Sequence, residues 1–272
     1  MNVSISTSVY VNYKIEDAIQ NISKIGFDGI DIWGGRPHIY RNDFSSKELK
    51  VINQSIRDVG LTIPSFMPAF YRYPYNLSHP KKIVRLDSID YMYRCLDNAA
   101  ELGAKSILII PGHSLSGQSR EDARQNLIDS IGAVLSYAEQ YPLLLAIEPV
   151  NRYVSDLINT ATDALEIIKM LDSDRIGVTL DTGHINLSNE SFQEAINLSH
   201  NCLIQLHIND NDGKRQQNII LGEGNFNFSS CKNILKSIQY DGFITVELDW
   251  QYTLDPNPAA EKVIQQVREL FI

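Results

Sequence analysis

Short apolar runs alternate with longer amphipathic stretches along the whole chain of 272 residues. The runs are rich in Ile, Val and Leu and have the length of strands, and we predict eight of them, at residues 3–7, 29–33, 61–66, 106–110, 143–148, 176–181, 203–208 and 243–248. The stretches between them place apolar residues three and four positions apart, as helices with one buried face do. Two of these stretches end in a glycine suited to a helix C-cap, at Gly26 and Gly60.

Strict alternation of strands and helices predicts a parallel sheet covered by helices. A closed (β/α)8 TIM barrel and an open doubly wound sheet both fit this pattern. Eight strands without a GxGxxG turn after the first one favour the barrel, whose usual length is about 250 residues. Nothing resembling a linker divides the chain, so we predict one catalytic domain over residues 1–272. The longest irregular stretch, residues 66–80, is more typical of a functional loop than of an idle one.

Composition narrows the function classes. The formal net charge of -9 disfavours nucleic-acid binding, which depends on Lys and Arg to neutralise phosphates. Three widely spaced cysteines, Cys95, Cys202 and Cys231, indicate neither a disulfide framework nor a CxxC metal site and favour a reducing cytoplasm. We find no secretion signal and no apolar run long enough for a membrane span. We therefore expect a cytoplasmic protein with a small-molecule partner, with homo-oligomerisation left open.

Four predicted strands end on side chains that can bind a metal: Glu148, Asp181, His207 and Glu247. Because the carboxyl ends of barrel strands meet at one mouth, these four side chains can converge. For any one of them alone, a polar cap on a strand is the more ordinary explanation. Three carboxylates crowded together, however, would repel each other unless a cation neutralised them. This oxygen-dominated set predicts one divalent ion, Mn, Mg, Co or Zn.

Two further histidines follow strands and would face the same mouth. His184 stands three residues beyond Asp181, and we expect it to orient a substrate. For His113, after the fourth strand, a role in the loop is as plausible as a role in binding. His79 and His200 have no partner in the sequence and are interpreted as surface residues.

Glycines and aromatic residues give weaker signals. The LGEG segment at 221–224 resembles an anion-binding nest, but a pair of loop glycines more often only supplies positive φ. An aromatic group either walls a sugar pocket or packs in the core, and we take Trp33 and Phe66 as its substrate-binding candidates; the group comprises Trp33, Phe66, Phe70, Tyr71, Tyr73, Tyr75 and Trp250.

Several segments together resemble the xylose-isomerase-like TIM barrels, which include sugar isomerases, ketose 3-epimerases and endonuclease-IV-type nucleases. The matching segments are IEPVNRY around Glu148, LDTGH around Asp181, LHINDNDG from His207, LGEG, and TVELDW around Glu247. In the first half, GFDGIDIWGGRPH and YPYN are similar to the fructoselysine 3-epimerases of the ketose 3-epimerase branch. The resemblance implies a ketose, or a ketose conjugated to an amine, as substrate.

The resemblance also implies roles for individual residues. The four strand-end residues would bind the metal, Glu148 and Glu247 would in addition act as acid and base, and Arg215 would contact the substrate. A proton next to a carbonyl becomes removable when a metal polarises that carbonyl, and one carboxylate on each face can remove it and return it. Inversion at C3 would follow through an enediolate.

The chain departs from the family pattern at two places. Val154 stands where ketose 3-epimerases carry a further Glu, which leaves the substrate open. Gln216, Gln217 and Asn218 replace the Asp-x-His of the trinuclear nucleases, and the third strand ends at Ser65 and Phe66 without their His. One ion rather than three is therefore expected. An aldose-ketose isomerase, an inosose-type dehydratase and a catalytically silent sugar-binding barrel stay open as alternatives.

Overall fold

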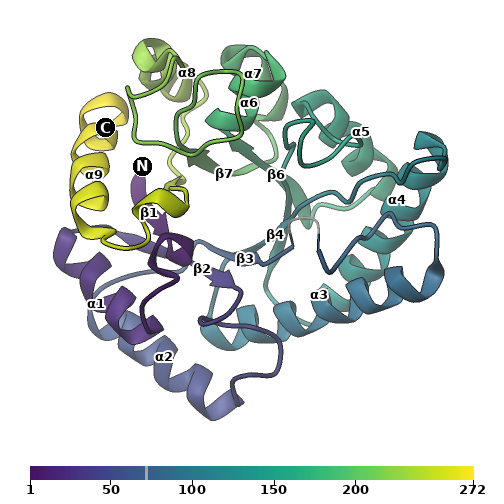
Figure 1. The fold of residues 1–272 in the computed structure, drawn as a ribbon, viewed down its shortest axis with the longest axis horizontal. Coiled ribbons are helices and arrows are strands. Elements are labelled where there is room, and N and C mark those ends of the chain that lie inside the picture. The colour runs from purple at the N-terminus through teal and green to yellow at the C-terminus, as the bar shows by residue number, and fades with distance from the viewer. Residues whose placement is uncertain (71–72) are drawn as a thin grey trace.

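A computed structural model describes residues 1–70 and 73–272 and shows a closed barrel of eight parallel strands. The strands follow one another around the barrel in chain order, and β1 pairs with β8 to close it, as Figure 1 shows. They are β1 (Asn2–Ser6), β2 (Gly29–Gly34), β3 (Ser65–Pro68), β4 (Ser106–Ile109), β5 (Leu144–Ile147), β6 (Ile176–Asp181), β7 (Leu203–Ile208) and β8 (Phe243–Val246). The predicted TIM barrel is confirmed, and closure excludes the open sheet.

Helices connect the strands and form the outer ring in Figure 1. They are α1 (Ile15–Ile25), α2 (Ser46–Asp58), α3 (Lys82–Leu102), α4 (Arg120–Ala138), α5 (Ala161–Leu171), α6 (Thr182–Ser188), α7 (Phe192–Ser199), α8 (Cys231–Ser237) and α9 (Asn257–Phe271). Short 3-10 segments lie at η1 (Thr7–Tyr10), η2 (Phe228–Ser230) and η3 (Trp250–Tyr252). As predicted, α1 ends on Gly26, whose φ of 97° lets its N–H bond to the carbonyls of Ile22 and Ser23.

The third strand begins later than the sequence predicts. Residues 61–66 were expected, but β3 runs from Ser65 to Pro68, and Thr62 makes only an isolated bridge to Gly29. Pro64 accounts for the shift, because it has no N–H to donate to β2 or β4. The backbone before β3 still contributes acceptors, since Lys105 and Ser106 donate to the carbonyls of Ile63 and Pro64.

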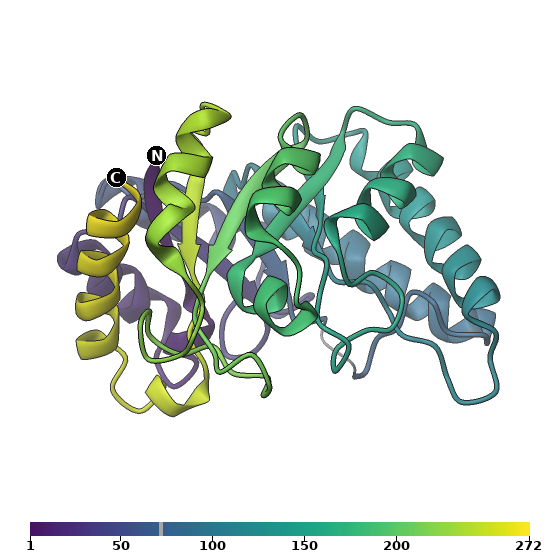
Figure 2. The same cartoon turned by 90° about the horizontal axis from the view of Figure 1, so that it is seen from above.

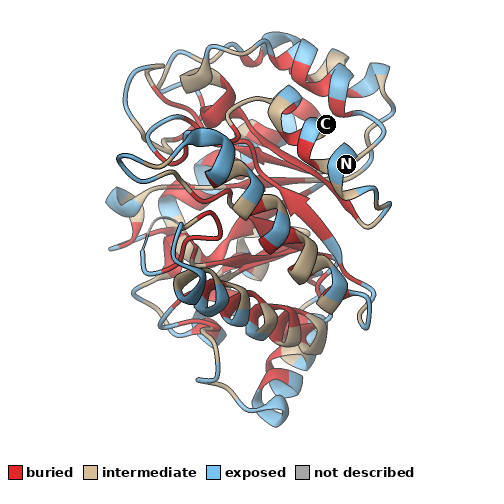
Figure 3. Cartoon of the chain, turned by 90° about the vertical axis from the view of Figure 1, so that its right-hand side faces the viewer, coloured by how far each residue is buried: buried red, intermediate tan, exposed pale blue. Residues whose placement is uncertain are grey.

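The strands separate two interiors of different character. Their outward faces and the helices enclose the main hydrophobic core. Figure 3 shows in red that the strands and the inner sides of the helices are buried. A much smaller apolar cluster of Met67, Leu108 and Ala146 is separate from that core. Buried polar side chains also come from the strands, among them Ser4, Asp31, Ser65, Thr179, Gln205 and Thr245. TIM barrels usually fill the inside of the barrel with branched apolar residues, so this polar content is unusual.

Long connections gather at the carboxyl ends of the strands, at the lower edge of Figure 2. The two termini lie near each other beside β1 and α9 (Figures 1 and 2). Within the described residues, every helix is too short or too polar to cross a membrane. Cys95, Cys202 and Cys231 are free thiols, and Cys95 and Cys231 are buried.

A buried histidine holds the connection after β2 against η1. His38 is fully buried, with Nδ1 3.0 Å from Thr7 Oγ1 and Nε2 3.2 Å from the Tyr13 carbonyl oxygen. Burial lowers its pKa to about 4, although the hydrogen bond to Tyr13 opposes this shift. The folded protein therefore holds this imidazole neutral, whereas the unfolded chain protonates it below its ordinary pKa of about 6.5.

We predict that His38 makes the fold sensitive to mild acid. As pH falls from about 6.5 to about 4, the unfolded state gains a proton that the folded state lacks, which removes about 3 kcal/mol of unfolding free energy. Denaturant unfolding of the wild type and His38→Gln across this range measures the effect. The difference in unfolding free energy between the two proteins should shrink as pH falls. A difference that stays constant across this range would contradict a neutral, buried His38.

Candidate metal centre

The predicted ligands lie at the carboxyl ends of four consecutive strands. Asp181 ends β6 and is in register with His207 on β7. Glu148 and Glu247 directly follow β5 and β8, and their N–H groups continue the ladders by donating to the carbonyls of Ile109 and Ile208, each at 3.1 Å. One ligand atom from each of the four residues lies within 4.8 Å of the others. The expected convergence is confirmed.

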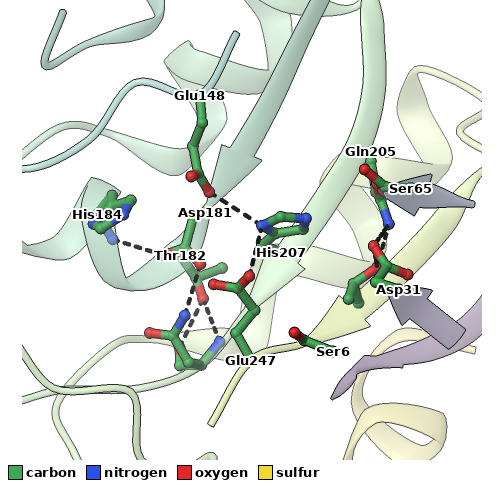
Figure 4. Close-up of polar contacts among 12 residues, drawn as sticks. Ser6, Asp31, Ser65, Glu148, Asp181, Thr182, His184, Gln205, His207 and Glu247 are labelled. Carbon is green, nitrogen blue, oxygen red and sulfur yellow. Dashed lines mark hydrogen bonds and ion pairs between the residues drawn. The ribbon is translucent and has the colours of Figure 1, made fainter. Parts of the chain in front are cut away.

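His207 lies at the middle of the cluster, as Figure 4 shows. Its Nδ1 is 3.1 Å from Glu148 Oε1 and 3.5 Å from Glu247 Oε1. His207 is fully buried, Glu148 and Asp181 are 3% and 2% exposed, and the Glu247 side chain is 14% exposed. Carboxylate oxygens and one imidazole nitrogen at this spacing are a suitable donor set for a single divalent ion.

The Asp181 carboxylate is held on both oxygens. Oδ1 accepts from the His184 N–H at 2.8 Å, which caps the N-terminus of α6, and Oδ2 accepts from Asn209 Nδ2 at 2.7 Å. Such hydrogen bonds orient a metal-binding carboxylate before an ion arrives. Asn209 was not predicted from the sequence, although it follows His207 by two residues within the segment that resembles the family.

The charges of the cluster cannot balance without a cation or added protons. Burial and the charges of Glu148 and Asp181 raise the pKa of Glu247 to about 8, although His207 opposes this. Burial lowers the pKa of His207, but Glu247, Glu148 and Asp31 outweigh it and raise that pKa to about 10. In Glu148, burial is outweighed by the bond from His207, and its pKa falls. A divalent ion would replace the proton of His207.

A cavity of about 520 Å³ opens above the cluster. Of the four predicted ligands, only Glu148 and Glu247 line it, together with the predicted substrate residues His184 and Trp33. Asp249 adds a third carboxylate to the wall. None of the described lining residues is Lys or Arg. The described part of the wall therefore presents carboxylates, polar amides and aromatic rings to a ligand.

His184 is placed as a substrate-orienting residue would need to be. It is 8% exposed, lines the cavity, and its Nδ1 lies 2.9 Å from Asn151 Nδ2. The Asn151 amide also donates to Gln216 Oε1, another residue of the cavity wall. Asn151 was not among the candidates, and its position within IEPVNRY was the one available signal.

Phe66 does not line the cavity. It is fully buried in the main core, where its ring packs so close to Gly34 that a Cβ there would come within 2.6 Å of it. The neighbouring Met67 lines the cavity instead. Side chains alternate along a strand, so the substrate wall expected at Phe66 is formed one residue later.

Arg215 and His113 also lie away from the wall formed by the described residues. The Arg215 side chain is 76% exposed and pairs with Asp212, Nε to Oδ2 at 2.9 Å. His113 is half-buried, and its backbone carbonyl accepts from Asn76 Nδ2 and Ser78 Oγ, each at 2.9 Å. These contacts account for the local structure of both loops without a substrate.

The aromatic group divides between pocket and core. Trp33, Phe70, Tyr73 and Trp250 line the cavity, with Tyr73 89% and Trp250 67% exposed at its mouth. Tyr75 is buried and stacks on Tyr91 with ring centroids 4.0 Å apart. Tyr71 lies outside the described residues.

The LGEG loop forms an anion nest, and the anion that it binds is the side chain of Asp210. Gly222 and Gly224 donate their N–H groups to Asp210 Oδ2 at 2.9 and 3.0 Å. The nest is therefore a structural clamp on its own loop. Of the histidines expected at the surface, His200 is exposed and His79 is half-buried.

Comparison with known proteins places the chain in a family. Residues 19–270 match the family described as xylose isomerase-like TIM barrel. The chain belongs to this family. Fructoselysine 3-epimerase of Escherichia coli O157:H7 is 27% identical over 271 residues, which cover 100% of this chain and 98% of that protein. D-psicose 3-epimerase of Agrobacterium fabrum (strain C58) is 26% identical over 239 residues, 84% of this chain and 77% of that protein.

A solved structure agrees with this fold. The crystal structure of a D-psicose 3-epimerase in the presence of D-fructose superimposes with a TM-score of 0.84 at 21% identity, covering 99% of both chains. Within this xylose isomerase-like barrel, Val154 is buried and lies outside the described cavity wall, whereas Gln216 and Asn218 belong to that wall. In the described residues, the set centred on His207 is the single group of His, Cys, Asp and Glu suited to an ion.

We predict one divalent ion per chain and proton release when it binds. Since the pKa of His207 is about 10 without an ion, each ion that binds below that pH must displace its proton, and affinity should rise with pH. Calorimetry with Mn²⁺ in buffers of different ionisation enthalpy counts the protons. Asp181→Asn should weaken binding by about 100-fold or more, and Asp212→Asn, at a half-buried loop position where the carboxylate pairs with Arg215, serves as control. Equal affinities in the two variants would contradict the site.

Proposed function

We propose that the protein is a divalent-metal-dependent epimerase that inverts C3 of a ketose or ketose conjugate. The main support is that Glu148 and Glu247 are the two ligands that both border the ion site and line the cavity. The epimerases named above support the same class of reaction. Mn, Mg, Co and Zn all suit the donor set.

The glutamates would move the protons. They extend from β5 and β8 and approach His207 Nδ1 with separate carboxylates, so that a sugar in the cavity can have one on each face. When bound, the ion would polarise the carbonyl at C2 and lower the barrier to removing the C3 proton. One glutamate takes that proton, and the other returns a proton to the opposite face of the sugar enediolate. The stereocentre is inverted without oxidation or reduction.

The remaining wall residues would position the sugar. His184 would hold a hydroxyl or carbonyl oxygen through the ring nitrogen that does not face Asn151. Trp33, Met67 and Phe70 would cover the apolar face of the sugar and exclude water from the reacting carbon. Asp181 and His207, which do not line the cavity, would serve as ligands only.

We predict stereospecific exchange at C3. Metal-loaded protein incubated with a panel of ketoses in D₂O should place deuterium at C3 of an inverted product. Deuterium at C1 would instead indicate aldose-ketose isomerisation, and loss of water a dehydratase. Glu247→Gln and Glu148→Gln should each reduce turnover by about 100-fold or more, since each removes a proton-transfer group. Exchange with none of the sugars, together with unchanged ligand binding in Glu148→Gln, would support a silent sugar-binding barrel.

We further predict that the enzyme prefers unphosphorylated substrates. Glu148 and Glu247 would be paired with the ion, but Asp249 is a further carboxylate on the described cavity wall, and the described part of that wall has no Lys or Arg to pair with a phosphate. A phosphate brought near Asp249 in this enclosed site would be repelled by its carboxylate, so kcat/KM for a ketose should exceed that for its terminal phosphate ester by about tenfold. A conjugate carrying an amine meets no such repulsion. Equal or faster turnover of the phosphate ester would show that the wall does not select in this way.

A further inference from the structure

A group of polar side chains is buried beneath the ion site, one layer deeper in the barrel. Gln205 and Thr245 precede His207 and Glu247 by two residues, and alternation therefore places them on the same face of their strands. Asp31 on β2 and Ser4 on β1 complete the layer, and all four residues are 0–1% exposed. These strands, β7, β8, β1 and β2, are successive neighbours in the barrel.

The layer is organised around the Asp31 carboxylate. Asp31 Oδ2 accepts from Gln205 Nε2 at 2.7 Å and from Thr245 Oγ1 at 3.3 Å, while the Thr245 hydroxyl also lies 2.7 Å from Ser4 Oγ. Gln205 Nε2 bonds to Thr245 Oγ1 as well. A buried carboxylate is costly for a fold, and burial raises the pKa of Asp31 to about 6 although His207 opposes the shift. A well-packed apolar residue at this position would cost less folding free energy.

Three atoms beneath the ion site lack hydrogen-bond partners. His207 Nε2, Asp31 Oδ1 and Gln205 Oε1 are all enclosed, and no described residue bonds to them. Leaving a buried N–H unsatisfied costs about 1–3 kcal/mol. Figure 4 shows His207 with Nδ1 toward Glu148 and Glu247, on the opposite side of the ring from Nε2, and with Gln205 and Asp31 beyond. The charge of Asp31 also acts on His207, since it contributes to the raised pKa of that imidazole.

We propose that Asp31 is a positioning residue that accepts the Nε2–H of His207 through a bridging water and so fixes Nδ1 as the ligand atom. Metal-binding histidines generally donate their second ring nitrogen to a carboxylate or carbonyl, which sets the tautomer and the ring orientation. Gln205 and Thr245 occupy one Asp31 oxygen and leave the other for the water. This inference rests on the ion site proposed above, but not on the identity of the substrate or the reaction.

The test compares variants by metal affinity, without an activity assay. Asp31→Asn retains the shape of the side chain and removes the charge, and it should weaken Mn²⁺ binding by about 10–100-fold in calorimetry. Asp28→Asn is the matched control, because Asp28 lies just before the same strand and bonds to the Val3 N–H at 2.9 Å, outside the polar layer. Its Mn²⁺ affinity should stay within about twofold of the wild type.

The tautomer supplies a second readout that a purely structural role would not change. In Zn²⁺-loaded wild-type protein, ¹⁵N–¹H spectra should show a slowly exchanging Nε2–H on His207, and Asp31→Asn should shift this signal and speed its exchange. If Asp31→Asn does not fold, Gln205→Met tests the same network, with an expected loss of Mn²⁺ affinity of about tenfold.

Wild-type affinity together with an unchanged Nε2–H signal in a folded variant would overturn the role of Asp31. That result would leave the ion site and the epimerase intact, because Asp181→Asn still tests the site and deuterium exchange still tests the reaction. Conversely, a wild-type protein that binds no divalent ion would overturn the ion site and the role of Asp31 with it.

Discussion

Three carboxylates crowd around one buried imidazole at the mouth of this barrel, and the charges of that group decide how the surrounding structure is built. Without a cation, the group has to hold protons: the pKa of His207 rises to about 10 and that of Glu247 to about 8. A divalent ion removes the need for those protons and turns mutual repulsion into shared attraction. Affinity for an ion, and the retention of protons by His207 and Glu247 in its absence, therefore have the same electrostatic origin.

The loop after β7 forms part of the cavity wall above this group. Asp210 accepts backbone N–H groups from Gly222, Gly224 and Phe226, and its own backbone pairs with Ile219. The loop is thereby folded back on itself, and the segment between these anchors brings Gln216 and Asn218 to the cavity wall. Backbone N–H donors therefore satisfy the Asp210 carboxylate, so it stabilises the loop and is not a ligand in the ion site.

The fold was predictable from the alternation of strands and helices, and the ligands were predictable from the residues at the carboxyl ends of the strands. Alternation of strands and helices implies a parallel sheet, and parallel strands in a barrel bring their final residues together, so Glu148, Asp181, His207 and Glu247 could be located without coordinates. Phe66 was misplaced because Pro64 delays the start of β3, and a strand of four residues offers too little alternation to show which face is inward. Asp31 was overlooked because a single acid inside the apolar run GIDIW gives no local sign that its partners come from β7 and β8.

The outward face of the strands packs against the helices in the hydrophobic core, whereas the inward face carries the polar layer and the ion ligands. On β1 and β2, Val3, Ile5, Ile30 and Ile32 are fully buried in the core shared with the helices, whereas Ser4 and Asp31 alternate with them and join the polar layer. Because the core between sheet and helices is large, the inside of the barrel is free to hold hydrogen-bonded acids and amides that an apolar filling would exclude. Burying Asp31, Gln205 and Thr245 costs stability, but these residues can orient His207 from beneath the ion site. This arrangement is expected where the orientation of a metal ligand matters more than a further gain in packing energy.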